Sequence, residues 1–137
     1  MPGYWILKSE PSTYSYADLE RDGRTVWDGI RNAQALIHVR SMKQGDRALF
    51  YHTGAEKAIV GIARIASDPY PDPKAAGDKL VVVDLVPDQI LKRPIPLAEI
   101  KADRAFAALG LVRHARLSVV PVSPAQWKRL LAAGGGR

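Results

Sequence analysis

The sequence predicts an α+β fold in which a closed or partly closed barrel of short strands is flanked by short helices. Several short apolar segments are separated by turns that contain glycine. These segments outnumber the helical connections that a parallel sheet requires, and the predicted helices are spaced irregularly among them. A length of 137 residues suits one domain with its own core, so we predict a single domain at 1–133 and a flexible tail at 134–137.

Local patterns in the first half of the chain predict two strands and two helices. Residues 4–7 and 47–53 are the predicted strands. Ser15 and Asp18 form a capping box that begins a short helix ending near Arg21. Asn32 is predicted to cap a second helix, whose buried face carries apolar residues at helical spacing. These residues are Ala35, Leu36, Val39 and Met42.

In the second half, residues 58–66 and 80–86 are predicted strands, and 116–122 is expected to be extended. Gly61 inside the first of these strands indicates a bulge or a close backbone approach. Prolines exclude a regular central element at 68–73, and one or two short helices are expected within 96–109. The final helix begins at a second capping box with proline at its first position and has a buried apolar face. Its residues are Ser123, Pro124, Gln126, Trp127, Leu130 and Leu131.

The composition limits the classes of partner and location. Twenty Lys and Arg against fourteen Asp and Glu give a formal charge of +6, which favours a polyanionic partner such as nucleic acid. The basic residues are dispersed, so the fold must assemble any binding face. The sequence has no cysteine, which excludes disulfides, thiolate catalysis and sulfur-ligated zinc. No apolar run approaches membrane-spanning length and no secretory signal is visible, so we expect a cytoplasmic protein without a membrane partner.

Catalytic patterns are missing from the sequence. The three histidines, His38, His52 and His114, form neither an H-x-x-x-H nor an H-E-x-x-H pattern. There is no Gly-x-Ser-x-Gly elbow and no phosphate-cradling glycine loop. Ser9, Glu10 and His52 would form a hydrolytic set only if the fold brought them together, and their spacing in the sequence does not require this. We therefore expect a protein that is not an enzyme and that carries no metal and no cofactor.

Residues 27–32, with the sequence WDGIRN, combine an indole with polar groups and a glycine. Tryptophan offers a flat apolar face, Arg31 and Asn32 offer hydrogen-bond donors, and Gly29 allows a close backbone approach. Groups of these kinds are the ones that a binding site for a planar heterocycle, such as a nucleobase, requires. The same residues also fit a turn before a helix, with Asp28 or Asn32 as the cap and Trp27 in the core. The residues alone leave both interpretations open.

A series of short segments matches one known family in order along nearly the whole chain. The segments are YWILKSEP at 4–11, YS at 14–15, DL at 18–19, WDGIRN at 27–32, QA at 34–35, MKQGD at 42–46, FYH at 50–52, IVGIA at 59–63, YPD at 70–72, RLSV at 116–119 and PV at 121–122. Together they resemble the EVE domain family, which has a PUA-like mixed β-barrel and is related to the YTH readers of methylated adenine. Two positions depart from the family pattern, because Leu80 and Ala33 stand where relatives usually carry aromatic residues. Each departure removes a possible stacking surface.

The resemblance implies a non-catalytic reader of modified bases in nucleic acid, with DNA favoured over RNA. Such a reader would flip a base, for example 5-methylcytosine or 5-hydroxymethylcytosine, into an aromatic pocket. Trp27 matches by position the Trp that forms an aromatic wall in the YTH readers, so we assign it the stacking role. A PUA-like module for modified or structured RNA is the first alternative, and a small-molecule or protein-interaction domain is the second.

Further roles follow from the same resemblance. Ser9 and Asn32 are expected to contact the edge of the base, although Ser9 also fits a turn and Asn32 a helix cap. Lys8, Arg31 and Arg116 are expected to contact phosphate. Asp28 is expected to fix Arg31 rather than to contact the ligand.

The remaining candidates have weaker patterns. Tyr51 and His52 are neighbours on one strand, so only one of them can point at the site, and His52 also fits a satisfied core histidine. Tyr70 is placed to close over the pocket from its proline-rich loop, and Ser118 is either structural or ligating. The full predicted base pocket is Lys8, Ser9, Trp27, Asp28, Arg31, Asn32, Tyr51, His52, Tyr70 and Ser118.

Overall fold

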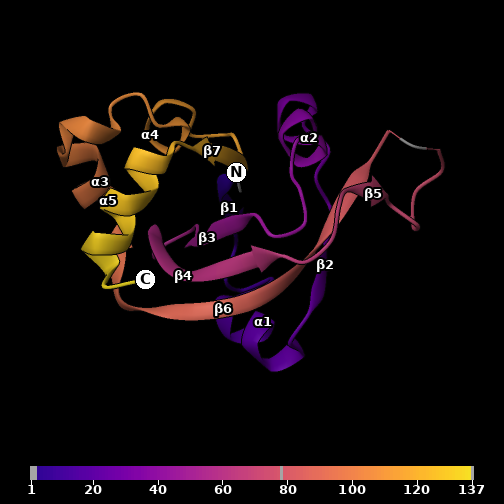
Figure 1. The fold of residues 1–137 in the computed structure, drawn as a ribbon, viewed down its shortest axis with the longest axis horizontal. Helices are drawn as coiled ribbons and strands as arrows, with labels where there is room; N and C mark the ends of the chain where they lie inside the picture. Colours follow the sequence, from indigo (N-terminus) through magenta and orange to yellow (C-terminus); the bar gives the residue numbers. More distant parts are fainter. Residues whose placement is uncertain (1–2, 78, 137) are drawn as a thin grey trace.

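A computed structural model describes residues 3–77 and 79–136 of the chain as strands of one sheet with helices around it (Figure 1). The strands are β1 (Tyr4–Ser9), β2 (Thr25–Trp27), β3 (Arg47–His52), β4 (Ala58–Ile65), β5 (Tyr70–Pro71), β6 (Val81–Pro96) and β7 (Val119–Val122). The helices are α1 (Tyr16–Asp22), α2 (Ala33–Arg40), α3 (Leu97–Ala102), the 3₁₀ turn η1 (Arg104–Phe106), α4 (Gly110–Arg113) and α5 (Pro124–Gly134).

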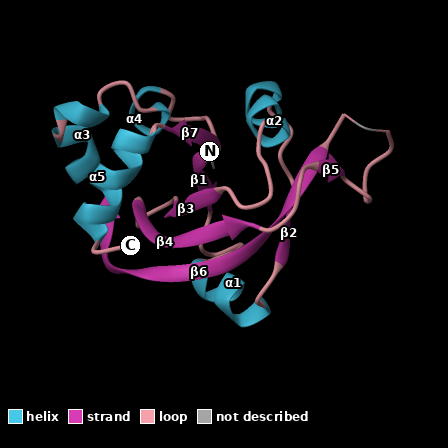
Figure 2. Ribbon diagram, in the orientation of Figure 1, coloured by secondary structure: helices cyan, strands magenta, loops and turns pink. Residues whose placement is uncertain are grey.

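The sheet curls into a half-barrel with short helices outside it (Figure 2). Its strand order is β2-β6-β4-β3-β1-β7, and β5 pairs with β6 in addition. β1 and β3 are parallel, whereas β6 is antiparallel to β2, β4 and β5. The predicted α+β fold with a partly closed barrel and flanking helices is therefore confirmed.

Both faces of the sheet are covered by apolar side chains. Successive residues of a strand point to opposite faces, and in β1 Trp5 and Leu7 enter one core cluster whereas Ile6 enters the other. Helices α1 and α2 pack on the first cluster, and α3, η1, α4 and α5 supply residues of the second. Figure 1 shows α3, α4 and α5 gathered at one side of the sheet, away from α1 and α2. Because helices cover both faces of the sheet, the central strands carry apolar side chains on both faces.

Gly61 in β4 is the predicted close approach. A Cβ at this position would lie 2.5 Å from Cε1 of Tyr16, so only glycine admits the ring. The Tyr16 hydroxyl donates a hydrogen bond to the Ile62 carbonyl oxygen at 2.7 Å. The β3–β4 and β4–β6 registers also shift beside Gly61, so the expected bulge is present too.

Both predicted capping boxes are confirmed. Ser15 accepts a hydrogen bond from the Asp18 amide and Asp18 accepts one from the Ser15 amide, which begins α1. Ser123 and Gln126 make the equivalent pair at α5. Asn32 caps α2 as predicted, but this helix ends at Arg40, so Met42 is buried from the following turn.

Strands β2 and β6 differ from the prediction, and the two-residue strand β5 (Tyr70–Pro71) was not predicted. Residues 25–27, for which the sequence predicts no strand, form β2 because their backbone pairs with β6, with Trp27 opposite Val83. The strand predicted at 80–86 begins at Val81 and continues to Pro96. Pro87 does not end it, because Pro87 lies at a register shift of the β4–β6 pair, where a proline is tolerated.

Helix α5 and a glycine turn form the end of the described chain. Helix α5 extends through Gly134, one residue beyond the predicted domain limit, and Gly134 packs against Leu91. Gly135 has a positive φ of 69° and donates to the Ala132 carbonyl oxygen, while Gly136 donates to the Leu131 carbonyl oxygen. This pair of bonds is a Schellman motif, which requires glycine in the left-handed position. Arg137 of the predicted tail lies outside the described residues.

Candidate functional site

Trp27 is positioned by the sheet and by two aromatic neighbours. It is the last residue of β2, so its pairing with Val83 of β6 fixes the direction of the side chain. The indole lies nearly perpendicular to the rings of Phe50 and Tyr14, with centroid distances of 5.5 and 6.2 Å. Trp27 is half-buried rather than sealed in the core. Part of the indole is therefore left as the wall of a cavity.

This cavity, which we name the Trp27 pocket, has a volume of about 430 Å³. Three segments that are distant in sequence meet there, namely the end of β1 with the turn after it, β2 with the loop after it, and the residue before β7. The lining residues are Lys8, Ser9, Glu10, Thr13, Tyr14, Thr25, Val26, Trp27, Asp28, Gly29, Ile30 and Ser118. Among the predicted base-pocket residues, Lys8, Ser9, Trp27, Asp28 and Ser118 are thus brought together.

Hydrogen bonds hold the walls of the Trp27 pocket. The Ser9 hydroxyl donates to the Tyr14 carbonyl oxygen, which closes the turn that carries Tyr14. The Lys8 amide donates to the Ser118 carbonyl oxygen at 3.0 Å, and the Lys8 ammonium donates to the Ala115 carbonyl oxygen at 2.9 Å. Ser9 therefore serves the turn that the residue pattern also allowed, and Lys8 ties β1 to the loop before β7.

The Trp27 pocket carries charges of both signs. Glu10 and Asp28 line it together with Lys8, whose ammonium is directed to the Ala115 carbonyl oxygen and lies 6.0 Å from the centre of the Tyr51 ring. Partial burial lowers the pKa of the Lys8 ammonium. Asp28 lies 3.6 Å from the Lys74 ammonium. The expected Asp28–Arg31 pair is wrong, because the chain turns at Gly29 with a φ of 78° and the carboxylate of Asp28 faces Lys74.

Three predicted ligands lie outside the Trp27 pocket. The Asn32 side-chain oxygen accepts a hydrogen bond from the Ala35 amide at 3.0 Å, so it caps α2. Arg31 is exposed and lines none of the described cavities. Arg116 is exposed and lines a second cavity together with Asn32. The helix-cap interpretation of Asn32 is therefore the one that the structure supports.

Tyr51, His52 and Tyr70 also do not line the Trp27 pocket. His52 is buried, accepts a hydrogen bond from the Tyr16 amide at 3.0 Å and contacts Glu56 through its other nitrogen at 2.9 Å. Tyr51 points to the opposite face of β3 and belongs to the second core cluster. The prediction that Tyr51 and His52 line the base pocket is therefore wrong. Tyr51 packs in the second core cluster, and His52 is held by hydrogen bonds with Tyr16 and Glu56.

Tyr70 takes part in a polar cluster at the outer side of β6. Its hydroxyl donates to the Asp84 carboxylate, which raises the pKa of Tyr70 to about 12. The bonds from Tyr70 and from Arg24 hold the pKa of Asp84 below its ordinary value. Arg24 Nη2 lies 2.7 Å from Asp84, so this cluster links the residue before β2 to β6 and β5. Tyr70 thus stabilises the strand that carries Trp27 but does not close over the pocket.

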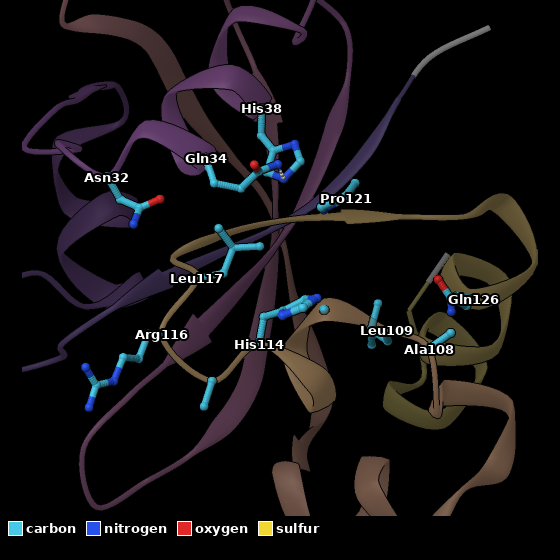
Figure 3. Close-up of a pocket in the computed structure, with 12 residues that line it drawn as sticks. Asn32, Gln34, His38, Ala108, Leu109, His114, Arg116, Leu117, Pro121 and Gln126 are labelled. Carbon is cyan, nitrogen blue, oxygen red and sulfur yellow. Dashed lines mark hydrogen bonds between the residues drawn. The ribbon is translucent and has the colours of Figure 1, made fainter.

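A second cavity, which we name the His114 groove, lies beyond the loop before β7 and has a volume of about 750 Å³ (Figure 3). It is bounded by α2, α4, the 114–117 loop, β7 and the start of α5. Its polar lining residues are Asn32, Gln34, His38, His114, Arg116 and Gln126. The Gln34 side-chain nitrogen lies 3.2 Å from His38 Nε2, and burial lowers the pKa of His38. Sequence reasoning found Asn32 and Arg116 but not this groove, because its walls come from segments that lie far apart in sequence.

Comparison with known proteins decides the family. The model of the EVE domain matches residues 3–133. The chain belongs to the EVE domain family. Human thymocyte nuclear protein 1 is 32% identical to it, over 96% of this chain and 74% of that protein. The family membership predicted from the motifs is confirmed.

Solved structures have the same fold as this EVE domain. A Rhodopseudomonas palustris protein is 43% identical with a TM-score of 0.93, and the match covers 97% of this chain and 93% of that one. Human thymocyte nuclear protein 1 in complex with DNA containing 5-methylcytosine is 30% identical with a TM-score of 0.87, covering 98% and 99%. The shared fold therefore extends over nearly the whole of this chain.

The two departures from the EVE pattern have structural outcomes. Leu80 is half-buried against the first core cluster and is not among the described residues that line the Trp27 pocket. Ala33 is the exposed first residue of α2. Neither position removes an aromatic wall from the Trp27 pocket, which depends on Trp27 and Tyr14. Tyr14 was missed as a pocket residue, although it lies only five positions after Ser9, which was predicted to line the pocket.

Two kinds of site are not found within the described part of the EVE domain. No group of three or more His, Cys, Asp or Glu side chains over 3–77 and 79–136 could hold a metal ion. Over the same residues, no helix has the length and apolar character needed to cross a membrane.

Proposed function

We propose that this protein is a non-catalytic reader of modified bases in DNA, which receives a flipped base such as 5-methylcytosine or 5-hydroxymethylcytosine in the Trp27 pocket. The observation that carries the proposal is the half-buried indole, fixed by β2 and lining a cavity of about 430 Å³ with Lys8, Ser9 and Ser118. The relative solved with DNA containing 5-methylcytosine supports DNA as the partner. The excess of Lys and Arg, which gives a formal charge of +6, supports a polyanion in general.

Stacking supplies the main contact to the base. An aromatic platform contributes about 1–3 kcal/mol per base and accepts any base, because every base has a π face. Trp27 lies on an edge strand that β6 and the Arg24–Asp84 pair hold in place, so the platform is preorganised. The base has to leave its stack to reach it, as in other proteins that act on single bases.

Discrimination between modified and unmodified cytosine is expected to be weak. Burial of one methyl group contributes about 0.8 kcal/mol, which corresponds to about a fourfold preference. A hydroxymethyl group that finds hydrogen-bond partners would discriminate more strongly, because its absence leaves polar groups of the pocket unpaired. Most of the affinity is expected from phosphate contacts and falls steeply as salt rises.

We also propose the cytoplasm as the location, in agreement with the absence of cysteine.

The test uses short oligonucleotides with one central cytosine, methylated or not, as DNA and as RNA, measured by fluorescence anisotropy at two salt concentrations. We expect the methylated DNA to bind best and the Trp27→Ala variant to lose roughly 5- to 150-fold in affinity. Ile90→Ala is the matched control, because it truncates an apolar residue of β6 that is 57% exposed and lies outside the described cavities.

Each other outcome has a defined meaning. Preference for RNA would favour the alternative of an RNA-binding module, and failure of all four oligonucleotides would favour a small-molecule or protein-interaction domain. Base affinity that is unchanged in a folded Trp27→Ala variant would show that the pocket is wrongly assigned. Release of a modified product during incubation would contradict the non-catalytic proposal.

A further inference from the structure

We infer that the His114 groove is a second subsite, which binds the sugar-phosphate backbone of the DNA strand next to the base held in the Trp27 pocket. The inference rests on the proposed function and extends it from one nucleotide to a bound strand. The His114 groove is a separate and larger cavity of about 750 Å³. A base bound in the Trp27 pocket does not by itself require a ligand in this groove.

The first argument is that the two cavities share their walls. Ser118 lines the Trp27 pocket, whereas Ala115, Arg116 and Leu117 line the groove. In the same way Ile30 lines the pocket and Asn32 lines the groove. Consecutive Cα atoms are about 3.8 Å apart, so the cavities lie on the two sides of walls only a residue or two thick. A strand whose base enters one cavity is therefore expected to run close to the other.

The second argument is the charge of the lining. The chain has fourteen Asp and Glu residues, yet none of them is among the described residues that line the His114 groove. The Trp27 pocket differs, because Glu10 and Asp28 are among its lining residues together with Lys8. A cavity of mixed charge suits a neutral base, and a cavity with Arg116 and no carboxylate suits a phosphodiester.

The third argument is the direction of the side-chain amides. Asn32 caps α2 and Gln126 completes the capping box of α5, and both accept the capping hydrogen bond through the side-chain oxygen. The oxygen of each amide is therefore used for the helix, and the remaining NH₂ group can only donate. Together with the Arg116 guanidinium, these NH₂ groups are the donors that the lining offers to a ligand rich in acceptor oxygens.

The first test removes positive charge from the groove. Arg116→Gln is expected to weaken binding of the oligonucleotide about equally with and without the methyl group. It is also expected to lower the slope of log K against log salt by about 0.7–0.9 for each phosphate that the variant no longer neutralises. Arg104→Gln is the matched control, because Arg104 is exposed in η1 and lines none of the described cavities.

The second test adds negative charge without unfolding the protein. Gln34 is exposed near the start of α2, where a carboxylate is favourable for the helix, so Gln34→Glu is expected to fold normally. We expect roughly a 3- to 10-fold loss of oligonucleotide affinity. Gln44→Glu makes the same charge change at an exposed turn residue outside the described cavities and is expected to retain wild-type affinity within about twofold.

A third measurement separates the subsite from the base pocket. The nucleoside 5-methyl-2′-deoxycytidine has no phosphate, so NMR shift titration of the wild type and of both groove variants is expected to give equal nucleoside affinities, while Trp27→Ala loses the nucleoside. If both groove variants bind oligonucleotide like their controls, with an unchanged salt slope, the subsite is refuted and the base pocket stands. If wild-type protein shows no preference for modified DNA and Trp27→Ala changes nothing, the proposed function itself fails.

Discussion

Two of the three tryptophans of this chain, Trp27 and Trp127, show how one residue type serves two purposes. Trp127 in α5 is 2% exposed, stacks on Tyr4 with a centroid distance of 4.6 Å and lies under the Arg47 guanidinium at 5.2 Å. Trp27 at the end of β2 is half-buried and has two nearly perpendicular aromatic neighbours. The core packs around Trp127, whereas a cavity remains beside Trp27. An aromatic residue is therefore available for a ligand only where its neighbours leave space.

The largest expected difference is in stability. Trp127→Ala leaves a large cavity in the second core cluster and is expected to lower the free energy of unfolding by about 3–5 kcal/mol. Trp27→Ala removes a side chain that is only half-buried, so it is expected to cost less. Urea denaturation followed by circular dichroism measures both. A Trp27→Ala variant less stable than Trp127→Ala would overturn the comparison, because Trp27 would then be the better packed residue.

A smaller loss of stability is expected at Gly61, which, like Trp127, lies at a tightly packed position. Gly61→Ala places a methyl group against the Tyr16 ring, and overpacking of this kind costs about 1–3 kcal/mol. Combining it with Tyr16→Leu is expected to cost less than the sum of the two single changes, because the clash is removed. Thermal unfolding of the four proteins tests this non-additivity. Strict additivity would show that the ring and Gly61 do not compete for space.

Polar contacts hold the strand of Trp27, and they predict a pH dependence. The pKa of Asp84 is lower in the folded protein than its ordinary value of 3.8, chiefly because Tyr70 donates to it. A lowered pKa stabilises the fold above pH 4, and this contribution is lost as the pH falls through the folded-state pKa. Tyr70→Phe is expected to cost about 1 kcal/mol at pH 7 and to raise the pKa of Asp84.

Urea unfolding at pH 7 and pH 2.5, with NMR titration of the Asp84 carboxyl, measures this effect. We expect the difference between wild type and Tyr70→Phe to shrink at the lower pH, because the pH falls toward the lowered folded-state pKa of Asp84. A difference that does not change with pH would assign the role of Tyr70 to packing.

The smallest expected effect is spectroscopic. Acrylamide in solution reaches the half-buried Trp27 but not Trp5 or Trp127, which are 7% and 2% exposed. Trp27→Phe is therefore expected to remove most of the quenchable fluorescence with little change in stability. Quenching that persists in this variant would place the accessible indole elsewhere in the chain.

Local signals in the sequence predicted the helix starts well. A capping box depends on residues three apart, so Ser15 with Asp18 and Ser123 with Gln126 identify α1 and α5 without tertiary information. Strands were less predictable. Pairing with β6 creates β2 and extends β6 through Pro87, and no local pattern records which partner a strand has.

The site was predicted in part for the same reason. Lys8 and Ser9 were found because they belong to a motif, and they do meet Trp27 in one pocket. Asn32 was predicted in the base pocket but lines the His114 groove, and Arg116, predicted to contact phosphate, lines the same groove. Residues 27–32 are contiguous in sequence, yet the turn at Gly29 directs Trp27 and Asn32 into two different cavities.

By itself the sequence determined the kinds of element, their caps, the positive charge and the family. Each of these depends on residues a few positions apart or on composition. Only the tertiary structure decided that Trp27 borders a cavity and that His52 is satisfied by Tyr16 and Glu56. It also decided that the neighbouring groove has no carboxylate among the described residues that line it. The physical reason is that strand pairing and core packing join residues more than forty positions apart, such as Trp27 with Val83 and Lys8 with Tyr51.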